Sequence, residues 1–371
     1  MVEPPRILFC FWGRRGALTQ FALEVGRAVA LRSDIDATLS VSRHNESFSE
    51  FESLGVELLP IDTFSTYAGA ALGLPRALAQ RRVLAQRAQR DRYHAAIELI
   101  PHVWSPVLMP ALRRFGARYA TIVHDANAHP GDWTARVKPI LDMPIRSADR
   151  VLTLSDAVAR GLLDQNRVAP DKLRVLFHPD FNYGVAPSRT RPGPGEPFRL
   201  LFLGRIMPYK GLPLFVEAVE RLRVRGLPAT AMVYGEGPLG DYGSRLEALG
   251  ADVVNRWLTA AEIGAALSRA HAVVLSHVEA SQSGVVAAAF GAGLPVVVTP
   301  VGGLAEQARN GGSVIAAKAD ASALADAVRR LMIEPELYQT CLDAVRLAAE
   351  GRSMARWLDA VVDAALCENC P

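Results

Sequence analysis

The sequence has little of several features that mark specialised classes of protein. Its 371 residues include four cysteines (Cys10, Cys341, Cys367 and Cys370), too few and too unevenly spaced for a disulfide framework. No apolar run approaches the roughly 20 residues that a membrane-spanning helix needs. The first residues carry an acid and two prolines instead of the basic segment and apolar stretch of a signal peptide. We therefore expect a cytoplasmic protein.

The sequence also lacks a strong bias of charge. It has 41 Lys and Arg against 38 Asp and Glu, a formal net charge of +3, so no general basic surface for nucleic acid is expected. Half of its residues (50%) are hydrophobic, which is enough to form a large core. A chain of this length exceeds what one hydrophobic core usually serves, which favours two domains.

Short apolar segments recur along the chain, and helix-like stretches separate them. The predicted strands are residues 7–12, 37–41, 56–61, 95–100, 119–123, 151–154 and 173–177, and then 199–203, 230–234, 253–257, 272–276, 295–299 and 313–316. Strands that are apolar on both faces and alternate with helices are typical of parallel sheets covered on both sides. We therefore expect an α/β protein with two doubly wound, Rossmann-like domains.

A segment rich in proline and glycine separates the two series of strands. It predicts a linker at residues 186–197, between an N-terminal domain of residues 1–185 and a C-terminal domain of residues 198–352. Residues 353–371 follow the completed second domain and contain an amphipathic helix. We expect this helix to cross back and pack on the first domain. Ligands of open α/β sheets bind beyond the carboxyl ends of the strands, so the chemistry is expected in those loops.

In the first half, two loops carry candidate residues. Gly13-Arg14-Arg15-Gly16 follows the first predicted strand and opens a helix, where backbone amides can approach an anion; a plain tight turn is the alternative. His124-Asp125 follows the fifth strand, where a histidine can exchange protons or donate to a sugar hydroxyl. A histidine that caps the next helix is the alternative there.

In the second half, Gly204 and Arg205 follow the first strand, and Lys210 comes five residues after Arg205. A guanidinium and an ammonium on one loop suit a diphosphate, although they also read as solvated surface cations. Gly235 begins a G-x-G-x-x-G pattern. This pattern lies in the second unit of its domain and lacks a convincing ribose-binding acid, which disfavours a dehydrogenase.

A third loop of the second half reads EASQSGVVAAAFGAGLP from Glu279 onward. Ser283 suits a helix N-cap, so the amides of Ser283, Gly284 and Val285 are expected to hold a phosphate. Glu279 is expected to accept hydrogen bonds from ligand hydroxyls. Because the following residues are small, a closely packed helix without a ligand is the alternative.

The segments FLGRIMPYKGLPLFVEA, YGEGPL and GLPVVVTPVGGLAE follow one another between residues 198 and 331. In order and spacing they resemble the retaining glycosyltransferases of family four. The resemblance extends more weakly over the first half through the glycine loop, VHD and residues 151–155. It implies the GT-B fold, in which two doubly wound Rossmann-like domains face a central cleft.

The resemblance also implies roles for individual residues. The catalytic set is His124, Glu279, Arg205 and Lys210, with the two cations on the diphosphate of the donor. The donor-binding set is Gly13, Gly16, Gly204, Arg205, Lys210, Gly235, Trp257, Leu258, Glu279, Ser283, Gly284 and Val285, with the nucleobase against residues 254–258. The acceptor-binding set is His124, Asp125, Arg14 and Arg15.

One motif departs from the family pattern. The second glutamate of the family's E-x7-E motif, which usually holds the nucleotide ribose, should fall at Ala287 or Ala288, and neither residue is acidic. A subset of the family has a similar [ST]-Q-S-G-V turn, so we interpret the site as a variant of the motif.

The resemblance implies sugar transfer from a UDP- or GDP-linked donor with retention of configuration, as in polysaccharide biosynthesis. It implies no cofactor and no obligatory metal. The compact D-x-D at Asp34 and Asp36 is expected at the wrong end of the sheet for a donor metal, and the C-x-x-C of Cys367 and Cys370 lacks a second pair of zinc ligands. A nucleotide-sugar 2-epimerase of the same fold and a non-catalytic sugar-nucleotide binder are the alternative functions.

The acceptor is expected to contain a sugar or to be lipid-linked. The stretch from Arg76 to Arg92 holds six arginines against one acid, Asp91. Such a basic helix predicts peripheral contact with a membrane at its inner face. A solvated helix face, or a wall of the acceptor site, are the other readings of this stretch.

Overall fold

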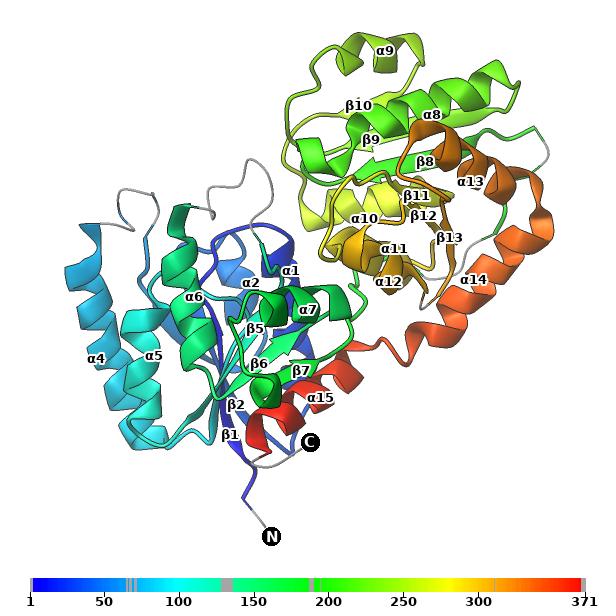
Figure 1. The fold of residues 1–371 in the computed structure, drawn as a ribbon. Coiled ribbons are helices and arrows are strands. Elements are labelled where there is room, and N and C mark those ends of the chain that lie inside the picture. Colours follow the sequence, from blue (N-terminus) through cyan, green and yellow to red (C-terminus); the bar gives the residue numbers. More distant parts are fainter. Residues whose placement is uncertain are drawn as a thin grey trace. The chain divides into compact units, whose positions relative to one another are not determined.

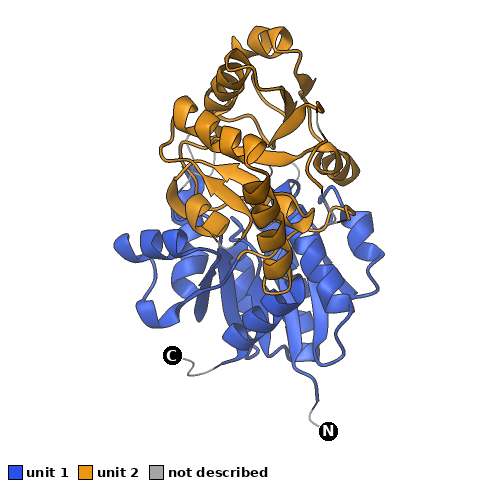
Figure 2. Cartoon of the chain, turned by 90° about the vertical axis from the view of Figure 1, so that its right-hand side faces the viewer, with its two compact units in different colours: residues 1–128, 133–177, 354–371 blue, residues 129–132, 178–353 orange. Residues whose placement is uncertain are grey.

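The computed structural model describes residues 3–64, 66, 69, 72–127, 136–186, 190–193, 195–309 and 311–367. The chain divides into two compact units (Figure 2). Unit 1 contains residues 1–128, 133–177 and 354–371, and unit 2 contains residues 129–132 and 178–353. The main segment of unit 2 thus begins at His178, ahead of the proline- and glycine-rich segment that predicts a linker.

Unit 1 is built on a parallel sheet of seven strands in the order β3-β2-β1-β4-β5-β6-β7 (Figure 1). The strands are β1 (Arg6–Phe11), β2 (Asp36–Ser42), β3 (Glu57–Ile61), β4 (Ala95–Glu98), β5 (Arg118–Val123), β6 (Arg150–Thr153) and β7 (Leu173–Val175). The central strands are buried on both faces, as expected for a sheet that helices cover on both sides. Each matches one of the predicted strands.

Two groups of helices cover this sheet. The helices are α1 (Ala17–Ala30), α2 (Phe48–Glu52), α4 (Leu74–Asp91), α5 (Ser105–Arg113), α6 (Lys138–Ser147), α7 (Asp156–Asp164) and α15 (Met354–Leu366). Helices α4 to α7 share one buried core on the sheet. Helix α15 packs beside α1, with Trp357 edge-on to Phe21 at 5.0 Å between ring centroids, and lies against β4, β5 and β6. The last helix of the chain therefore completes unit 1.

Unit 2 has a parallel sheet of six strands in the order β10-β9-β8-β11-β12-β13. The strands are β8 (Phe198–Leu203), β9 (Ala229–Tyr234), β10 (Asp252–Val254), β11 (Ala272–Leu275), β12 (Val296–Val298) and β13 (Ser313–Ile315). These also match the predicted strands. Both sheets have the strand order of doubly wound domains, so the prediction of two Rossmann-like domains is confirmed.

The helices of unit 2 form two layers with separate cores. They are α8 (Leu212–Val224), α9 (Tyr242–Ala248), α10 (Ala260–Arg269), α11 (Gly284–Gly291), α12 (Gly302–Arg309), α13 (Ala321–Ile333) and α14 (Pro335–Ala349). Helices α8, α13 and α14 contribute to one core, and α10, α11 and α12 to the other. The winding direction therefore reverses between β8 and β11.

Two further observations bear on the sequence analysis. Within the described residues, no helix is both long and apolar enough to cross a membrane. Cys10 and Cys341 are buried free thiols, whereas Cys367 is disulfide-bonded, a bond that the spacing of the cysteines did not lead us to expect.

Candidate functional site

The candidate donor site lies at the carboxyl edge of the unit 2 sheet, where β8 and β11 are neighbours. The helices that follow these two strands, α8 and α11, belong to different layers. The loops after β8 and β11 therefore diverge. Doubly wound sheets bind their ligands in the crevice between two such loops. Arg205 and Lys210 lie on the first of these loops, and Glu279 and Ser283 on the second.

The loop after β8 is held by backbone contacts on both sides. Gly204 N donates to Tyr234 O at 2.9 Å, and Ile206 N donates to Glu236 O at 2.8 Å. On the other side, Ser276 Oγ donates to Lys210 O at 3.1 Å. The loop is thus fixed between the ends of β9 and β11, which limits where its two cations can lie.

Glycine is required where this loop turns and packs most closely. Gly211 has φ of 68°, and a Cβ there would collide with the carbonyl oxygen of Ser276. Gly235 has φ of 152°, and a Cβ there would collide with the carbonyl oxygen of Gly204. The G-x-G pattern that suggested a dinucleotide site therefore has a packing reason, namely contact with the loop that carries Arg205.

The two cations of this loop differ in their surroundings. Arg205 is exposed, and Lys210 is partly buried. The Lys210 ammonium lies 5.4 Å from the centroid of the Tyr209 ring, within the range of a cation–π interaction. The carbonyl oxygen of Tyr209 accepts from Val278 N at 2.9 Å. The residue whose ring contacts Lys210 is therefore bonded to the loop after β11.

The amino terminus of α11 lies against the same loop. A Cβ built on Gly204 would be in ordinary contact with Val285 Cγ2, at 3.6 Å. Ser283 is the N-cap, and its Oγ accepts from Val285 N at 3.3 Å. The structure thus brings Gly204, Ser283, Gly284 and Val285 together, with the positive end of a helix beside the loop of Arg205.

Gln307 of α12 fixes this N-cap from outside the motif. Ser283 N donates to Gln307 Oε1 at 2.9 Å, and Gln307 Nε2 donates to Ser283 O at 3.1 Å. The amide side chain therefore binds both backbone groups of one residue. Gln307 was not predicted from the sequence, because no spacing rule connects it to Ser283.

Glu279 is exposed on the loop after β11. The chain turns directly after it, where Gly303 N donates to Ala280 O at 3.1 Å. Gly302 has φ of 44°, and a Cβ there would collide with Ala280 O. The start of α12 thus supports the segment that presents Glu279.

The small residues of α11 make room for a backbone segment. Ala287 and Ala288 are 1% and 2% exposed, and Phe181 N donates to Ala287 O at 3.1 Å. A Cβ on Gly291 would collide with the carbonyl oxygen of Phe181. At the two positions where the second motif glutamate was sought, a carboxylate would be buried in the core of unit 2.

The segment that packs on α11 is anchored by an ion pair. Arg352 Nε lies 2.9 Å from Asp180 Oδ1, and the guanidinium lies over the Phe290 ring at 4.5 Å. Burial raises the pKa of Asp180 to about 6, although Arg352 opposes the shift. Unit 2 thus holds its own first residues against the helix of the candidate donor site.

Trp257 and Leu258, the predicted nucleobase contacts, follow β10 and are partly buried. Their loop is connected to Gly235, whose N donates to Val254 O at 2.9 Å. It ends at a capping box in which Thr259 and Glu262 begin α10. The structure therefore places these residues two strands from β8, beyond the loop of Gly235.

In unit 1, the Gly13–Gly16 loop follows β1 and precedes α1. Asn45 Nδ2 donates to Gly13 O at 2.9 Å, and Gly16 N donates to Glu46 Oε1 at 2.8 Å. Arg14 is partly buried and Arg15 is exposed. The backbone amides of this loop were predicted to approach an anion. The Gly16 amide instead donates to a carboxylate of the same unit. Asn45 and Glu46 were missed by the sequence analysis.

His124 lies at the end of β5 and is buried, whereas Asp125 is exposed. The Nε2 atom of His124 lies 2.9 Å from Leu99 O. Because a carbonyl oxygen only accepts hydrogen bonds, Nε2 carries the proton. Burial lowers the pKa of His124, so the ring is neutral near pH 7 with Nδ1 as an acceptor. Leu99 N in turn donates to Cys10 O at 2.9 Å, which links the ends of β1, β4 and β5.

Glu98, at the end of β4, was also missed. It is 0% exposed and accepts hydrogen bonds from Ser105 Oγ, from Tyr119 OH at 2.5 Å and from Thr121 Oγ1 at 2.8 Å. Burial raises the pKa of Glu98 to about 7, although these bonds oppose the shift. An acid inside a strand that is otherwise apolar on both faces was the available signal.

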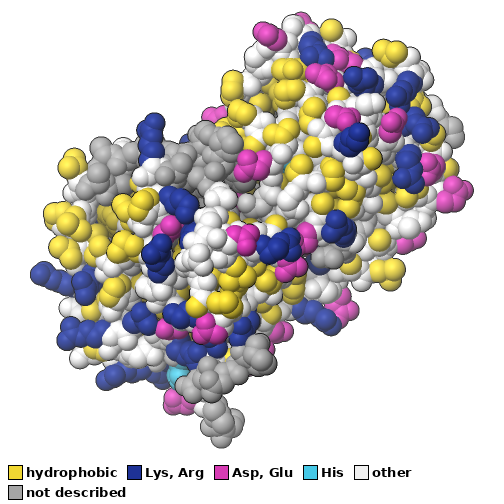
Figure 3. Space-filling model, in the orientation of Figure 1, with side chains coloured by type: hydrophobic (Ala, Val, Ile, Leu, Met, Phe, Trp, Pro, Cys, Tyr) yellow, Lys and Arg dark blue, Asp and Glu magenta, His cyan; other side chains and the backbone are white. Residues whose placement is uncertain are grey.

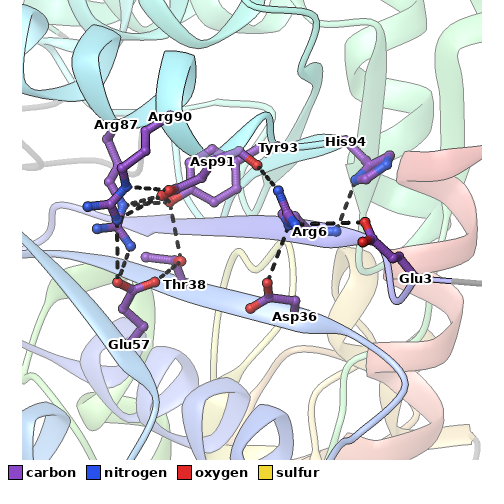
Figure 4. A network of polar contacts seen from close by, with 10 residues as sticks. All are labelled: Glu3, Arg6, Asp36, Thr38, Glu57, Arg87, Arg90, Asp91, Tyr93 and His94. Carbon is purple, nitrogen blue, oxygen red and sulfur yellow. Dashed lines mark hydrogen bonds and ion pairs between the residues drawn. The ribbon is translucent and has the colours of Figure 1, made fainter.

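The amino-terminal edge of the unit 1 sheet carries a separate polar network (Figure 4). Arg87 pairs with Glu57 and Asp91, and Arg90 Nε lies 2.6 Å from Asp91 Oδ1. Asp36 lies 3.6 Å from Arg6 in the same network. The D-x-D motif thus lies at the edge opposite the candidate residues, and this network engages Arg87 and Arg90 of the Arg76–Arg92 stretch in ion pairs.

Comparison with known proteins follows the same division of the chain. Residues 197–334 match the family model described as "Glycosyl transferases group 1". The matched segment lies within unit 2 and includes every candidate donor residue of that unit.

Two curated relatives match part of the chain. A glycogen synthase of Mycobacterium tuberculosis is 37% identical over 168 residues, which cover 43% of this chain and 39% of that protein. A D-inositol 3-phosphate glycosyltransferase of Saccharomonospora viridis is 30% identical over 257 residues, which cover 59% of this chain and 56% of that protein. The chain thus spans less than two thirds of the length of these relatives.

A solved structure matches nearly the whole chain in fold. The Anabaena protein Alr3699/HepE, in complex with UDP and glucose, superposes with a TM-score of 0.72 over 96% of this chain and 98% of that one, at 15% identity. At this identity the match concerns the fold alone, and it agrees with the two Rossmann-like domains described above.

Proposed function

We propose that the protein is a retaining glycosyltransferase that moves a sugar from a UDP- or GDP-linked donor to a glycan, lipid-linked or small-molecule acceptor. One observation carries the proposal. In a domain that matches the glycosyl transferases group 1 model, the loop of Arg205 and Lys210 packs on the first turn of α11, whose N-cap is held by Gln307.

The proposed chemistry is stabilisation of the leaving group. When the bond between the sugar and the diphosphate breaks, negative charge grows on the nucleoside diphosphate. Arg205 and Lys210 would neutralise this charge, and the amides at Ser283 to Val285 would add the positive end of a helix. Because backbone contacts fix the loop before the ligand binds, little reorganisation would accompany the reaction.

The remaining donor contacts follow from position. Glu279, exposed beside this helix, would bind hydroxyls of the donor sugar, and Trp257 and Leu258 would lie against the base. Since Ala287 and Ala288 are buried, the ribose would be held without the usual carboxylate. The HepE structure contains UDP and glucose, so UDP-glucose is the first donor to test.

We assign the acceptor to residues of unit 1. His124 would present Nδ1 to a hydroxyl, since its Nε2 is used by Leu99. Arg14 and Arg15 would bind an anionic acceptor, with Asp125 and the Gly13–Gly16 loop beside them. This part of the proposal rests on the family resemblance and on the position of these residues after β1 and β5.

A transfer assay tests the proposed function. We expect nucleoside diphosphate to be released from at least one sugar nucleotide only when an acceptor is added, and the product to keep the anomeric configuration of the donor. Lys210→Met, which retains an apolar stem, is expected to lower kcat by about 100-fold or more, as for loss of one group that stabilises developing charge. The exposed Arg221→Gln on α8 is the matched control.

The outcomes of this assay separate the alternatives. Conversion of the donor sugar without any acceptor would instead indicate a nucleotide-sugar 2-epimerase. Binding of donor with neither hydrolysis nor transfer, over a broad panel of acceptors, would indicate a non-catalytic binder. Inversion at the anomeric carbon would contradict the retaining mechanism.

A further inference from the structure

Exposed apolar side chains are concentrated at the start of α4 in unit 1. Of the twelve exposed large hydrophobic residues in the described part of the chain, four lie within residues 72–83: Leu72 at 80%, Leu74 at 55%, Leu78 at 45% and Val83 at 40%. We refer to these four residues as the α4 patch. Single exposed apolar residues are ordinary, but a cluster of this kind marks an interaction surface.

Helix geometry orders this surface. Ala77, Leu84 and Ala88 are the buried residues of α4 and face the core. Leu74, Leu78 and Arg82 are spaced by four residues, so they lie in line along one side of the helix. On the face drawn in Figure 3, hydrophobic side chains and arginines or lysines lie intermixed over the region where Figure 1 draws α4.

The arginines of α4 fall into two groups. The first group is engaged in ion pairs. Near the carboxyl end of the helix, Arg87 and Arg90 pair with Glu57 and Asp91 (Figure 4). Arg76 donates to Thr63 O at 3.1 Å and lies 3.7 Å from Asp62. Arg81 and Arg82 are exposed, and within the described residues neither has a hydrogen bond or ion pair. Among the described arginines within α4, the cations that remain available are thus the ones beside the α4 patch.

No acidic residue offsets these two charges along the helix. Between residues 72 and 90 the chain contains no Asp or Glu, and the single acid of α4, Asp91, is its last residue. A surface that combines exposed leucines with uncompensated arginines matches the interface of an anionic bilayer, which takes apolar side chains among its acyl chains and cations at its headgroups.

We propose that the α4 patch, with Arg81 and Arg82, docks the protein peripherally on a membrane that contains anionic lipids. The membrane contact predicted for the whole Arg76–Arg92 stretch is thereby assigned to the amino-terminal half of α4. This surface is separate from the candidate donor site in unit 2, so docking does not depend on the proposed glycosyl transfer. It would bring the protein to a layer in which a lipid-linked acceptor resides.

Vesicle binding tests the docking surface. The full chain is sedimented with vesicles of phosphatidylcholine alone and of phosphatidylcholine mixed with phosphatidylglycerol. We expect binding to the anionic vesicles that weakens as salt is raised. Because each arginine near such a surface is worth about 1 kcal/mol, Arg81→Gln/Arg82→Gln should weaken partitioning about thirtyfold. Leu74→Ser/Leu78→Ser should weaken it even at low salt.

Controls distinguish this surface from a general effect of charge. Arg221→Gln and Val224→Ser alter an exposed cation and an 89% exposed valine on α8 of unit 2, and both variants should bind vesicles as the wild type does. Circular dichroism of each variant checks that the helix is intact. Thermal stabilisation by sugar nucleotides, measured on the same samples, reports separately on the proposed donor site.

Three results would overturn the proposal. The first is no binding to anionic vesicles by the wild type. The second is equal loss of binding in the α8 controls. The third is self-association of the wild type that Leu74→Ser/Leu78→Ser abolishes while vesicle binding is unchanged, because the patch would then be an interface between two copies of the chain.

Discussion

At the scale of single residues, Glu98 is a carboxyl whose burial changes its titration. It is fully buried beneath the loop that carries His102, and Ser105, Tyr119 and Thr121 donate to it from α5 and β5. Cys10 of β1 lies nearby, and burial, together with the charge of Glu98, raises the pKa of its thiol. These groups surround a carboxyl that favours its protonated form.

This burial predicts a specific pH dependence of stability. Since the folded-state pKa of Glu98 is about 7 and its ordinary value is 4.5, the folded protein binds this proton more tightly than the unfolded chain does. The contribution to stability is full below about pH 4.5 and is lost as the pH rises to about 7, with a size of about 3 kcal/mol. Glu98→Gln should therefore flatten the fall in unfolding free energy across this window.

Urea unfolding at several pH values checks this prediction. Trp12, Trp104 and Trp357 all lie in unit 1, so tryptophan fluorescence reports chiefly on the unit that holds Glu98. Glu247→Gln, at an exposed position of α9, is the matched control. If Glu98→Gln and the wild type showed the same dependence on pH, the assignment of the titration to Glu98 would be wrong.

At the scale of elements, α11 explains why the chain uses small residues after Glu279. The backbone at Phe181 lies directly on this helix, where Phe181 N donates to Ala287 O and Phe181 O fills the space that a side chain at Gly291 would need. Packing therefore accounts for small residues at the two positions where a second motif glutamate was sought. Ala287 and Ala288 are themselves buried, so a carboxylate at either position would have to lie in the interior of unit 2.

Ala288→Glu tests this explanation. The new carboxylate would be buried without a partner, so we expect a loss of about 3 kcal/mol or more in the unfolding free energy. Ala265→Glu, at an exposed position of α10, should change stability little. Thermal unfolding of both variants measures the difference. An Ala288→Glu protein that kept its melting temperature and bound nucleoside diphosphates more tightly would show that the position faces a ligand.

The elements themselves could be predicted from the sequence, but several contacts of the candidate site could not. All strands follow from short apolar runs, because burial on both faces leaves a local pattern. Gln307 and Glu46 act on backbone groups far from them in sequence, and no local pattern reports such a contact. Glu98 was hidden for the opposite reason, since it lies inside a run that otherwise predicts a buried strand.

At the scale of the whole molecule, chain order and spatial order differ. Helix α15 follows the completed unit 2 and yet belongs to unit 1, where Trp357, Leu358 and Val361 are 0% exposed. The amphipathic pattern of this helix predicts that it packs, and its place in the chain led us to expect the first domain. The residues just before the predicted linker pack on α11, and the main segment of unit 2 begins at His178.

The central claim for the whole molecule is that unit 2 holds a nucleoside diphosphate between the Arg205–Lys210 loop and the start of α11. Calorimetric titration with UDP, GDP, ADP and dTDP tests it most directly, on the wild type, on Arg205→Gln/Lys210→Met and on the Arg221→Gln control. The account predicts that at least one nucleotide binds the wild type and the control with equal affinity, and that the double variant binds at least about 100-fold more weakly, a difference of about 2.7 kcal/mol. Absence of binding by all four nucleotides, or equal affinity of the double variant, would contradict it.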